Sequence, residues 1–492
     1  MKTLALILLP LVCAAADAPA GIDALLDAAR AAPAEFAADA TIRIAALDQL
    51  DKARRVELLQ QAFRSAAGAQ QPYKRHATFM QAGGPSGFLN RAYGQDLDAM
   101  SLRLRAIQTL LPLDAQKARD LFLQMPSPNT PRLKCDDFLI YDVGAFYDTL
   151  GNIARQSFSP QEVQAGEPSK LLARFVGNIA SPVQVAPVAS MLAAASVKDA
   201  DFRTLVSSFA QALGKISGDD RSFAYSIAAG KQILALVEAS KRRQSSPLPL
   251  LEAYRLYLVN NLSAARCGDD DSMIGTGVSF GFVAGQAVDQ EAQDAVAFFN
   301  RSLRMAPLQP IQEEESTPSR LEGLVTGLRT CEDAPCGAIA GQYRGLVFGE
   351  NGSAYTPQQK STPAWRAKVR DFLAALSRWQ EGSSDEGSTA ADHFRMKSEA
   401  YTDLLNLVFN GPDREPVLHS TTDYLKQDPF QRENRMEWFL PVNAVIGRMA
   451  LEPGGMALLA DELGKVDNPV MALYAKLETV APRTPDRILP LL

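Results

Sequence analysis

Apolar side chains recur at steps of three and four along most of this sequence. An α-helix turns once every 3.6 residues, so this spacing places them on one face, where they can pack against a neighbour. We interpret each stripe as the buried face of a helix and not as a cofactor site. The clearest stripes are Met100, Leu104, Ile107 and Leu111; Leu251, Tyr254, Leu258, Leu262 and Ala265; and Trp365, Val369, Phe372, Leu376 and Trp379.

Helix starts are marked by a small polar residue followed by proline. The polar side chain accepts a hydrogen bond from a free amide of the first turn, and proline fits the first helical position because no N–H is needed there. Ser159 also has Glu162 three residues on, which completes a capping box. The polar residues of these pairs are Ser159, Ser181, Ser246, Thr362, Asp428 and Asn468. They predict helices of about 10–20 residues joined by short loops.

No series of predicted strands alternates with these helices. The main β-like segment is residues 346–348, which Asn351-Gly352 could close as a hairpin turn. Many medium helices on short loops favour stacking in pairs. The sequence therefore predicts an all-α fold of stacked helical hairpins, an α-solenoid-like array with a smaller carboxy-terminal helical unit.

Part of this pattern is similar to a known repeat. Ala295, Phe299, Ser302 and Pro307 resemble the second helix of a tetratricopeptide repeat, and Ala118 with Phe122 repeats a fragment of it. Where the first helix of that repeat carries its Trp, Leu-Gly and Tyr, the chain has Ser279, Phe282, Val283 and Gln286. The resemblance is therefore to the class of degenerate helical-hairpin repeats (tetratricopeptide or HEAT-like), and not to one family. It implies a fold that works by binding.

Proline, acidic residues and glycine gather between residues 306 and 361, which predicts a break in the array. We predict four segments on this basis. They are a signal peptide at 1–16, an amino-terminal helical array at 17–306, a linker or loop region with a local disulfide at 307–361, and a carboxy-terminal helical unit at 362–492.

The amino terminus is typical of a secretory signal peptide. Lys2 precedes an apolar run at residues 4–12, and the small residues at 14–18 fit an A-x-A cleavage site after Ala16 or Ala18. Cys13 raises the alternative of a lipoprotein, but Val12 stands where that signal requires a smaller residue. We expect a free product in the periplasm or outside the cell, with no transmembrane span in the mature chain. The uncharged stretches at 175–197 and 272–288 are interrupted by proline, asparagine or glycine. Neither is therefore the continuous apolar run of about 20 residues that a transmembrane helix requires.

Cysteine usage agrees with export. Removal of the leader leaves Cys135, Cys267, Cys331 and Cys336, which allow three pairings. The separation of Cys331 and Cys336 suits a local bridge, and Cys135 with Cys267 would then close a long loop. In an oxidising compartment we expect disulfides at these positions, with reduced buried thiols as the alternative.

The charge balance excludes one class of partner. The chain has 492 residues and a formal net charge of −6, without the clustered basic residues that neutralise phosphates. We therefore expect no nucleic-acid partner. The short basic run at 241–243 follows an apolar helical pattern and suits the carboxyl end of a helix.

One motif carries candidate catalytic chemistry. Gly277-Val278-Ser279-Phe280-Gly281 matches G-x-S-x-G, the nucleophile turn of α/β-hydrolases, and Asp392 with His393 or His419 could complete a triad. That turn requires a buried strand before it, whereas residues 269–271 are all aspartate. We interpret the segment as a glycine-rich turn, and Ser279 stays only a weak candidate. The glycines also lack the strand that a dinucleotide site requires, so no cofactor is predicted.

The sequence offers few residues in a pattern that binds a metal ion. His76, His393 and His419 are far apart in the sequence and form no ligand motif. Carboxylates lie beside two cysteines, at Asp136, Asp137, Asp269, Asp270 and Asp271, and a Cys135–Cys267 bridge would bring them together. Calcium binds oxygen-rich clusters, but no EF-hand spacing is present. We favour a helix start at Asp136 and Asp137 and a solvated loop at 269–271, with no metal site.

Together these features favour an exported, non-enzymatic scaffold that binds a protein or peptide through its helical surface. The alternative is an exported hydrolase or lyase acting on envelope polysaccharide or ester substrates. It would require a cleft with paired carboxylates, or Ser279 beside a histidine.

The preference for a solvated aspartate loop makes a direct prediction. Adding millimolar calcium to the folded protein should release no heat in isothermal titration calorimetry, because isolated carboxylates bind the ion too weakly. A saturable heat that disappears when Asp269, Asp270 and Asp271 are replaced by asparagine would contradict it.

Overall fold

The computed structural model describes residues 21–76, 95–133, 137–216, 220, 222–223, 229–261, 334–349, 354–380, 390–408, 411–427, 435–452, 454–465 and 467–481. Within these ranges the protein is all-α, as predicted, apart from one two-stranded ribbon. β1 (Lys74–His76) and β2 (Asp137–Leu139) pair antiparallel, with Lys74 opposite Leu139. The solenoid, which requires a repeating unit, stays a prediction.

The helices fall into two groups along the chain. The amino-terminal group comprises α1 (Gly21–Ala31), α2 (Ala34–Ala45), α3 (Lys52–Ser65), η1 (Ala66–Gly68), α5 (Ala99–Leu110), α6 (Ala115–Phe122), α7 (Val143–Gln156), α8 (Pro160–Gln164), α9 (Glu167–Val176), η3 (Pro182–Gln184), α10 (Val185–Ala193), α11 (Asp199–Leu213), α13 (Gly230–Arg242) and α14 (Leu248–Asn261). The carboxy-terminal group comprises α17 (Ala334–Val347), α18 (Pro357–Lys360), α19 (Pro363–Arg378), α20 (Ala390–Val408), α21 (Arg414–Leu425), α22 (Arg435–Ala450), α23 (Gly455–Gly464) and α24 (Pro469–Val480).

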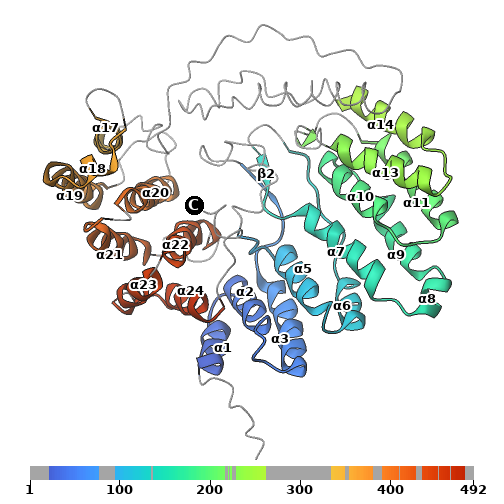
Figure 1. Ribbon diagram of the computed structural model, residues 1–492, viewed down its shortest axis with the longest axis horizontal. Coiled ribbons are helices and arrows are strands. Elements are labelled where there is room, and N and C mark those ends of the chain that lie inside the picture. Colours follow the sequence, from blue (N-terminus) through green and yellow to red (C-terminus); the bar gives the residue numbers. More distant parts are fainter. Residues whose placement is uncertain are drawn as a thin grey trace, which may run out of the picture.

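The helices are arranged as a curved band in which the two groups adjoin (Figure 1). Alternate helices contact one another, so that one row runs α20–α22–α24–α2–α5–α7–α10–α13. A second row contains α9, α11 and α14 on one side and α19, α21 and α23 on the other. The row passes from the end of the chain to its beginning at α24 and α2. The first and last described helices therefore lie in the middle of the band, and not at its ends.

The apolar stripes and several helix starts are confirmed, but Ser181 precedes only the three-residue η3, and α8 after Ser159 has five residues where about 10–20 were predicted. Every described member of the three apolar stripes is at most 8% exposed, while Leu262 and Ala265 lie outside the described residues. Ser159 and Glu162 form the predicted capping box before α8, and Thr362 and Asn468 cap α19 and α24. Local side-chain bonds to first-turn amides thus begin these helices as expected.

The predicted linker at 307–361 contains helical structure. Residues 346–347, expected as β-like, form the last turn of α17, and only Phe348 pairs as a bridge with Ala354. Ile339, Tyr343 and Leu346 are buried on one face of this helix, and the Trp365 indole N–H donates to the Leu346 carbonyl at 3.0 Å. The glycines that suggested a loop leave this packing face intact. Where the domains begin and end stays a prediction.

The expected helix start at Asp136 and Asp137 is wrong for Asp137, which lies in β2. Helix α7 begins later, because Asp142 is its N-cap and accepts a hydrogen bond from the Ala145 amide at 3.0 Å. Asp136 lies outside the described residues.

The contact between the two groups is centred on an aromatic cluster. Phe36 of α2 is fully buried, and its ring centroid lies 4.8 Å from that of Phe439 and 5.9 Å from that of Tyr474. Trp438 packs edge-on against the same ring at 6.4 Å. Aromatic burial of this kind contributes a large share of packing energy, so Phe36 joins α2 to α22 and α24.

Ion pairs surround this cluster on α2. Asp39 is bound by Arg105 of α5 at 2.6 Å and accepts a hydrogen bond from the Tyr474 hydroxyl at 2.7 Å. Burial by itself raises the pKa of Asp39, but Arg105 and these hydrogen bonds more than offset it, and the pKa lies below its ordinary value. Arg43 pairs with Glu478 of α24 at 2.8 Å. A third pair joins α2 to α22, between Glu35 and Arg435 at 2.6 Å.

Replacing Asp39 by asparagine should lower the free energy of unfolding by about 3–5 kcal/mol at pH 7, because Arg105 would lose its buried counter-ion. Urea denaturation measures this. The pKa of Asp39 is lower in the folded state than in the unfolded state, so ionised Asp39 stabilises the fold at pH values above the unfolded-state pKa. This stabilisation is lost as the pH falls through the folded-state pKa. The variant should therefore lose less stability than the unmodified protein on acidification below about pH 4.

Asp27→Asn is the matched control. Asp27 pairs with Arg30 at 2.7 Å on the exposed surface of α1, where such a pair contributes less than about 1 kcal/mol. Equal effects of the two replacements would contradict a buried junction on α2.

Candidate functional site

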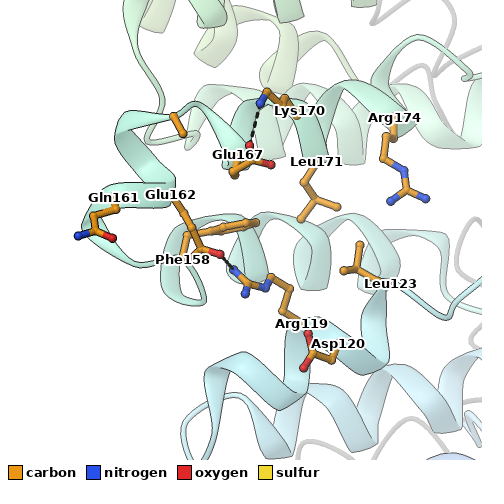
Figure 2. Close-up of a pocket in the computed structure, with 11 residues that line it drawn as sticks. Arg119, Asp120, Leu123, Phe158, Gln161, Glu162, Glu167, Lys170, Leu171 and Arg174 are labelled. Atoms are coloured by element: carbon orange, nitrogen blue, oxygen red, sulfur yellow. Dashed lines mark hydrogen bonds and ion pairs between the residues drawn. The ribbon is translucent and has the colours of Figure 1, made fainter.

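An open groove lies between α6 and the pair α8 and α9. It has a volume of about 680 Å³. We call it the α6–α9 groove, and Figure 2 shows its lining side chains. They are Arg119, Asp120, Leu123, Phe158, Gln161, Glu162, Ala165, Glu167, Lys170, Leu171 and Arg174.

The helical period builds the groove from two amphipathic walls. In α6, Ala118 and Phe122 are fully buried, which turns Arg119 and Leu123, one residue further on, toward the groove. In α9, Leu172 and Val176 are buried, and Arg174 lies on the exposed side. The two helices thus contribute their less buried edges, one to each side of the groove.

One end of the groove is polar and internally paired. Arg119 binds Glu162 at 3.0 Å, donates to the Ser157 carbonyl at 3.1 Å and lies 4.5 Å above the Phe158 ring. The amide of Ser159 donates to Glu162, and together with Arg119 it holds the pKa of this carboxyl below its ordinary value. These contacts also tie α6 to α7 and α8, so this end has a structural role.

The other end combines apolar surface with a cation. Leu123 is 44% exposed beside the buried Leu171, and Arg174 reaches into the same end from α9 (Figure 2). Lys170 pairs with Glu167 at 2.7 Å on the surface of that helix. A concave surface with apolar lining and a few polar side chains is the usual form of a ligand site.

Sequence reasoning missed this groove. Ala118 and Phe122 were noted only as part of a repeat pattern, although Leu123 and Val163 offered a signal. Both are large apolar residues off the buried stripes, and both are exposed, Val163 by 43%. Such positions mark surface that a periodic core pattern does not account for.

Most of the predicted site residues lie outside the described residues. These are Ser279, Asp136, Asp269, Asp270, Asp271, Cys135, Cys267 and Cys331. The backbones of Asp137 and Cys336 belong to β2 and α17, while their side chains are not described. Disulfide pairing, the absence of a calcium site and a non-catalytic Ser279 therefore stay predictions.

Two of the histidines have identified surroundings. His419 of α21 lies 2.8 Å from a Glu462 oxygen, and Lys465 binds the same carboxyl group at 2.7 Å. His393 of α20 packs edge-on against Trp379, with ring centroids 4.8 Å apart. Across the described ranges, no group of three or more His, Cys, Asp or Glu side chains could hold a metal ion.

A buried carboxyl group at the start of α5 has a strongly raised pKa. Asp98 is 0% exposed and caps the helix by accepting the Met100 and Ser101 amides at 3.0 Å. Burial, together with the nearby charge of Asp96, raises the pKa of Asp98 to about 7, although the bonds from Ser101 lower it in part. Asp98 therefore retains a proton close to neutral pH.

The helices of the described ranges include none that is long and apolar enough to cross a membrane. No protein-family model matches the chain, and the comparisons with curated proteins and with solved structures find no match. The α6–α9 groove and the sequence are therefore the features that indicate function.

The raised pKa of Asp98 predicts how stability depends on pH. Between about pH 4 and 7 the folded state binds a proton that the unfolded state does not, so the free energy of unfolding falls as the pH rises through this window. Asparagine caps a helix equally well and carries no charge. Asp98→Asn should therefore gain roughly 2–4 kcal/mol at pH 8 and little at pH 4 in urea denaturation.

Asp114→Asn supplies the comparison for this variant. Asp114 is the N-cap of α6, but its side chain is in contact with solvent. The pH profile of this variant should follow that of the unmodified protein. Identical profiles for the two variants would show that Asp98 does not titrate as described.

Proposed function

We propose that this protein is an exported scaffold that binds a peptide segment of a partner protein in the α6–α9 groove. The main support is the exposed Leu123, which lies beside Leu171 in this groove of about 680 Å³ and is flanked by charged side chains. Helical surfaces often bind extended or helical segments in such grooves, with apolar contacts for affinity and rim charges for orientation.

Export is part of the same proposal. The apolar run at 4–12 with the small residues at 14–18 supports a leader, and the four cysteines of the mature chain support an oxidising compartment. Disulfides between Cys331 and Cys336 and between Cys135 and Cys267 belong to this proposal too.

The charges of the groove favour binding over catalysis. A general acid needs a carboxyl group that keeps its proton near neutral pH. Glu162 is instead held ionised by the Ser159 amide and Arg119, and Glu167 is paired with Lys170. These carboxylates therefore suit the recognition of a ligand better than proton transfer.

The buried junction on α2 supports the same function. It packs α2 with α5, α22 and α24 in one row, and the groove helices contact this row through α5 and α7. A frame that is rigid before binding loses less conformational freedom when the ligand arrives, which favours affinity.

Selection of peptides from a random display library on the mature protein tests the proposal. Selected peptides should bind in fluorescence anisotropy, and Leu123→Asp should weaken binding about tenfold or more, because a charge would replace the apolar contact. Val163→Asp is the matched control, since Val163 is equally exposed and does not line the groove. It should change binding by no more than about twofold.

Circular dichroism must show that both variants keep their helical content. Failure to select any peptide, or equal binding by the Leu123 and Val163 variants, would refute binding in this groove.

A further inference from the structure

The ion pairs of the α6–α9 groove leave one cation uncompensated. Arg119 is paired with Glu162 and Lys170 with Glu167. Arg174 forms no ion pair within the described part of the chain. In Figure 2 it is separated from Asp120, which lies beside Arg119 on the other wall.

Arg174 is also free to donate. Its guanidinium carbon lies 5.8 Å from the centroid of the Phe175 ring, a long cation–π contact that uses none of its N–H groups. A guanidinium offers several donors in a planar fork, which matches the two oxygens of a carboxylate. Arg174 can therefore bind the carboxylate group of a ligand at this end of the groove.

Apolar surface lies next to that cation. Leu123 on α6 and Leu171 on α9 line the same end, and neither can satisfy a polar group of a ligand. The complementary ligand therefore carries an aliphatic side chain close to its carboxylate. Contacts that pair charge with apolar burial give both orientation and affinity.

We infer that the groove recognises an internal Asp or Glu side chain next to an aliphatic residue in the bound segment, with Arg174 binding the carboxylate. This rests on the proposed function of the groove. An internal acidic residue fits better than a chain terminus, because capture of a terminal carboxylate uses several convergent donors. At this end the donors come from Arg174 and from Lys170, which is already paired with Glu167.

Peptides selected on the mature protein, acetylated and amidated so that their only carboxylates are side chains, test the inference. Replacing the acidic residue by its amide should weaken binding about tenfold, and Arg174→Glu should weaken binding of the acidic peptide by at least as much. A peptide that carries lysine in place of the acidic residue should bind more tightly to the Arg174→Glu variant than to the unmodified protein.

Arg203→Glu is the matched control, because Arg203 lies exposed on α11 and does not line the groove. It should leave the affinity within about twofold. Increased salt should weaken binding of the acidic peptide more than binding of its amide version, because salt screens the added electrostatic contact.

The outcomes separate the two proposals. Peptides that depend on Leu123 but bind equally as acid and amide would overturn the role of Arg174 and leave the groove as the binding site. Binding that requires a free terminal carboxylate would overturn recognition of an internal residue. If no peptide binds, both proposals fail.

Discussion

The contact of α2 with the last helices of the chain determines how the rest of this protein is arranged. Phe36 packs against Phe439 and Tyr474, and Asp39 lies between Arg105 and the Tyr474 hydroxyl. Asp39 and Tyr474 are 435 residues apart in the sequence. Because of this contact, the row of helices is continuous from α20 to α13, and the first and last described helices lie within the band. Without it, two helical groups would each expose an apolar face.

The polar groups at this junction add specificity to apolar packing. Hydrophobic burial has no direction, so aromatic rings alone would tolerate several registers between α2 and α24. Asp39, Arg43 and Glu35 each require a charged partner at one defined place. Buried ion pairs contribute little net stability compared with apolar residues of the same size, but the loss of one partner is costly. A shifted register would leave these charges unpaired.

Two other buried titratable groups are held at helix ends. Asp98 caps the amino end of α5, and Lys397 donates to the Trp379 carbonyl at the carboxyl end of α19, 5.0 Å from the Tyr424 ring. Lys397 matches the sign that its helix end favours, whereas Asp98, whose pKa is raised to about 7 by burial, caps its helix by accepting hydrogen bonds. The α6–α9 groove differs, because Arg174 is exposed and has no ion-pair partner in the described ranges. Surface charge next to exposed leucine is available to a ligand, whereas the buried charges are committed to the fold.

The sequence by itself determined the local structure. The stripe from Trp365 to Trp379 and the caps at Ser159 and Thr362 predicted helices that the structure contains, because interactions between residues three and four apart can be read along the chain. Helix α17 was missed, since its glycines suggested a loop while its packing face is formed with α19. Only the tertiary structure decided that α2 meets α24 and that Leu123 and Arg174 share one groove. Such contacts depend on which faces meet across long stretches of chain, and no local pattern encodes that choice.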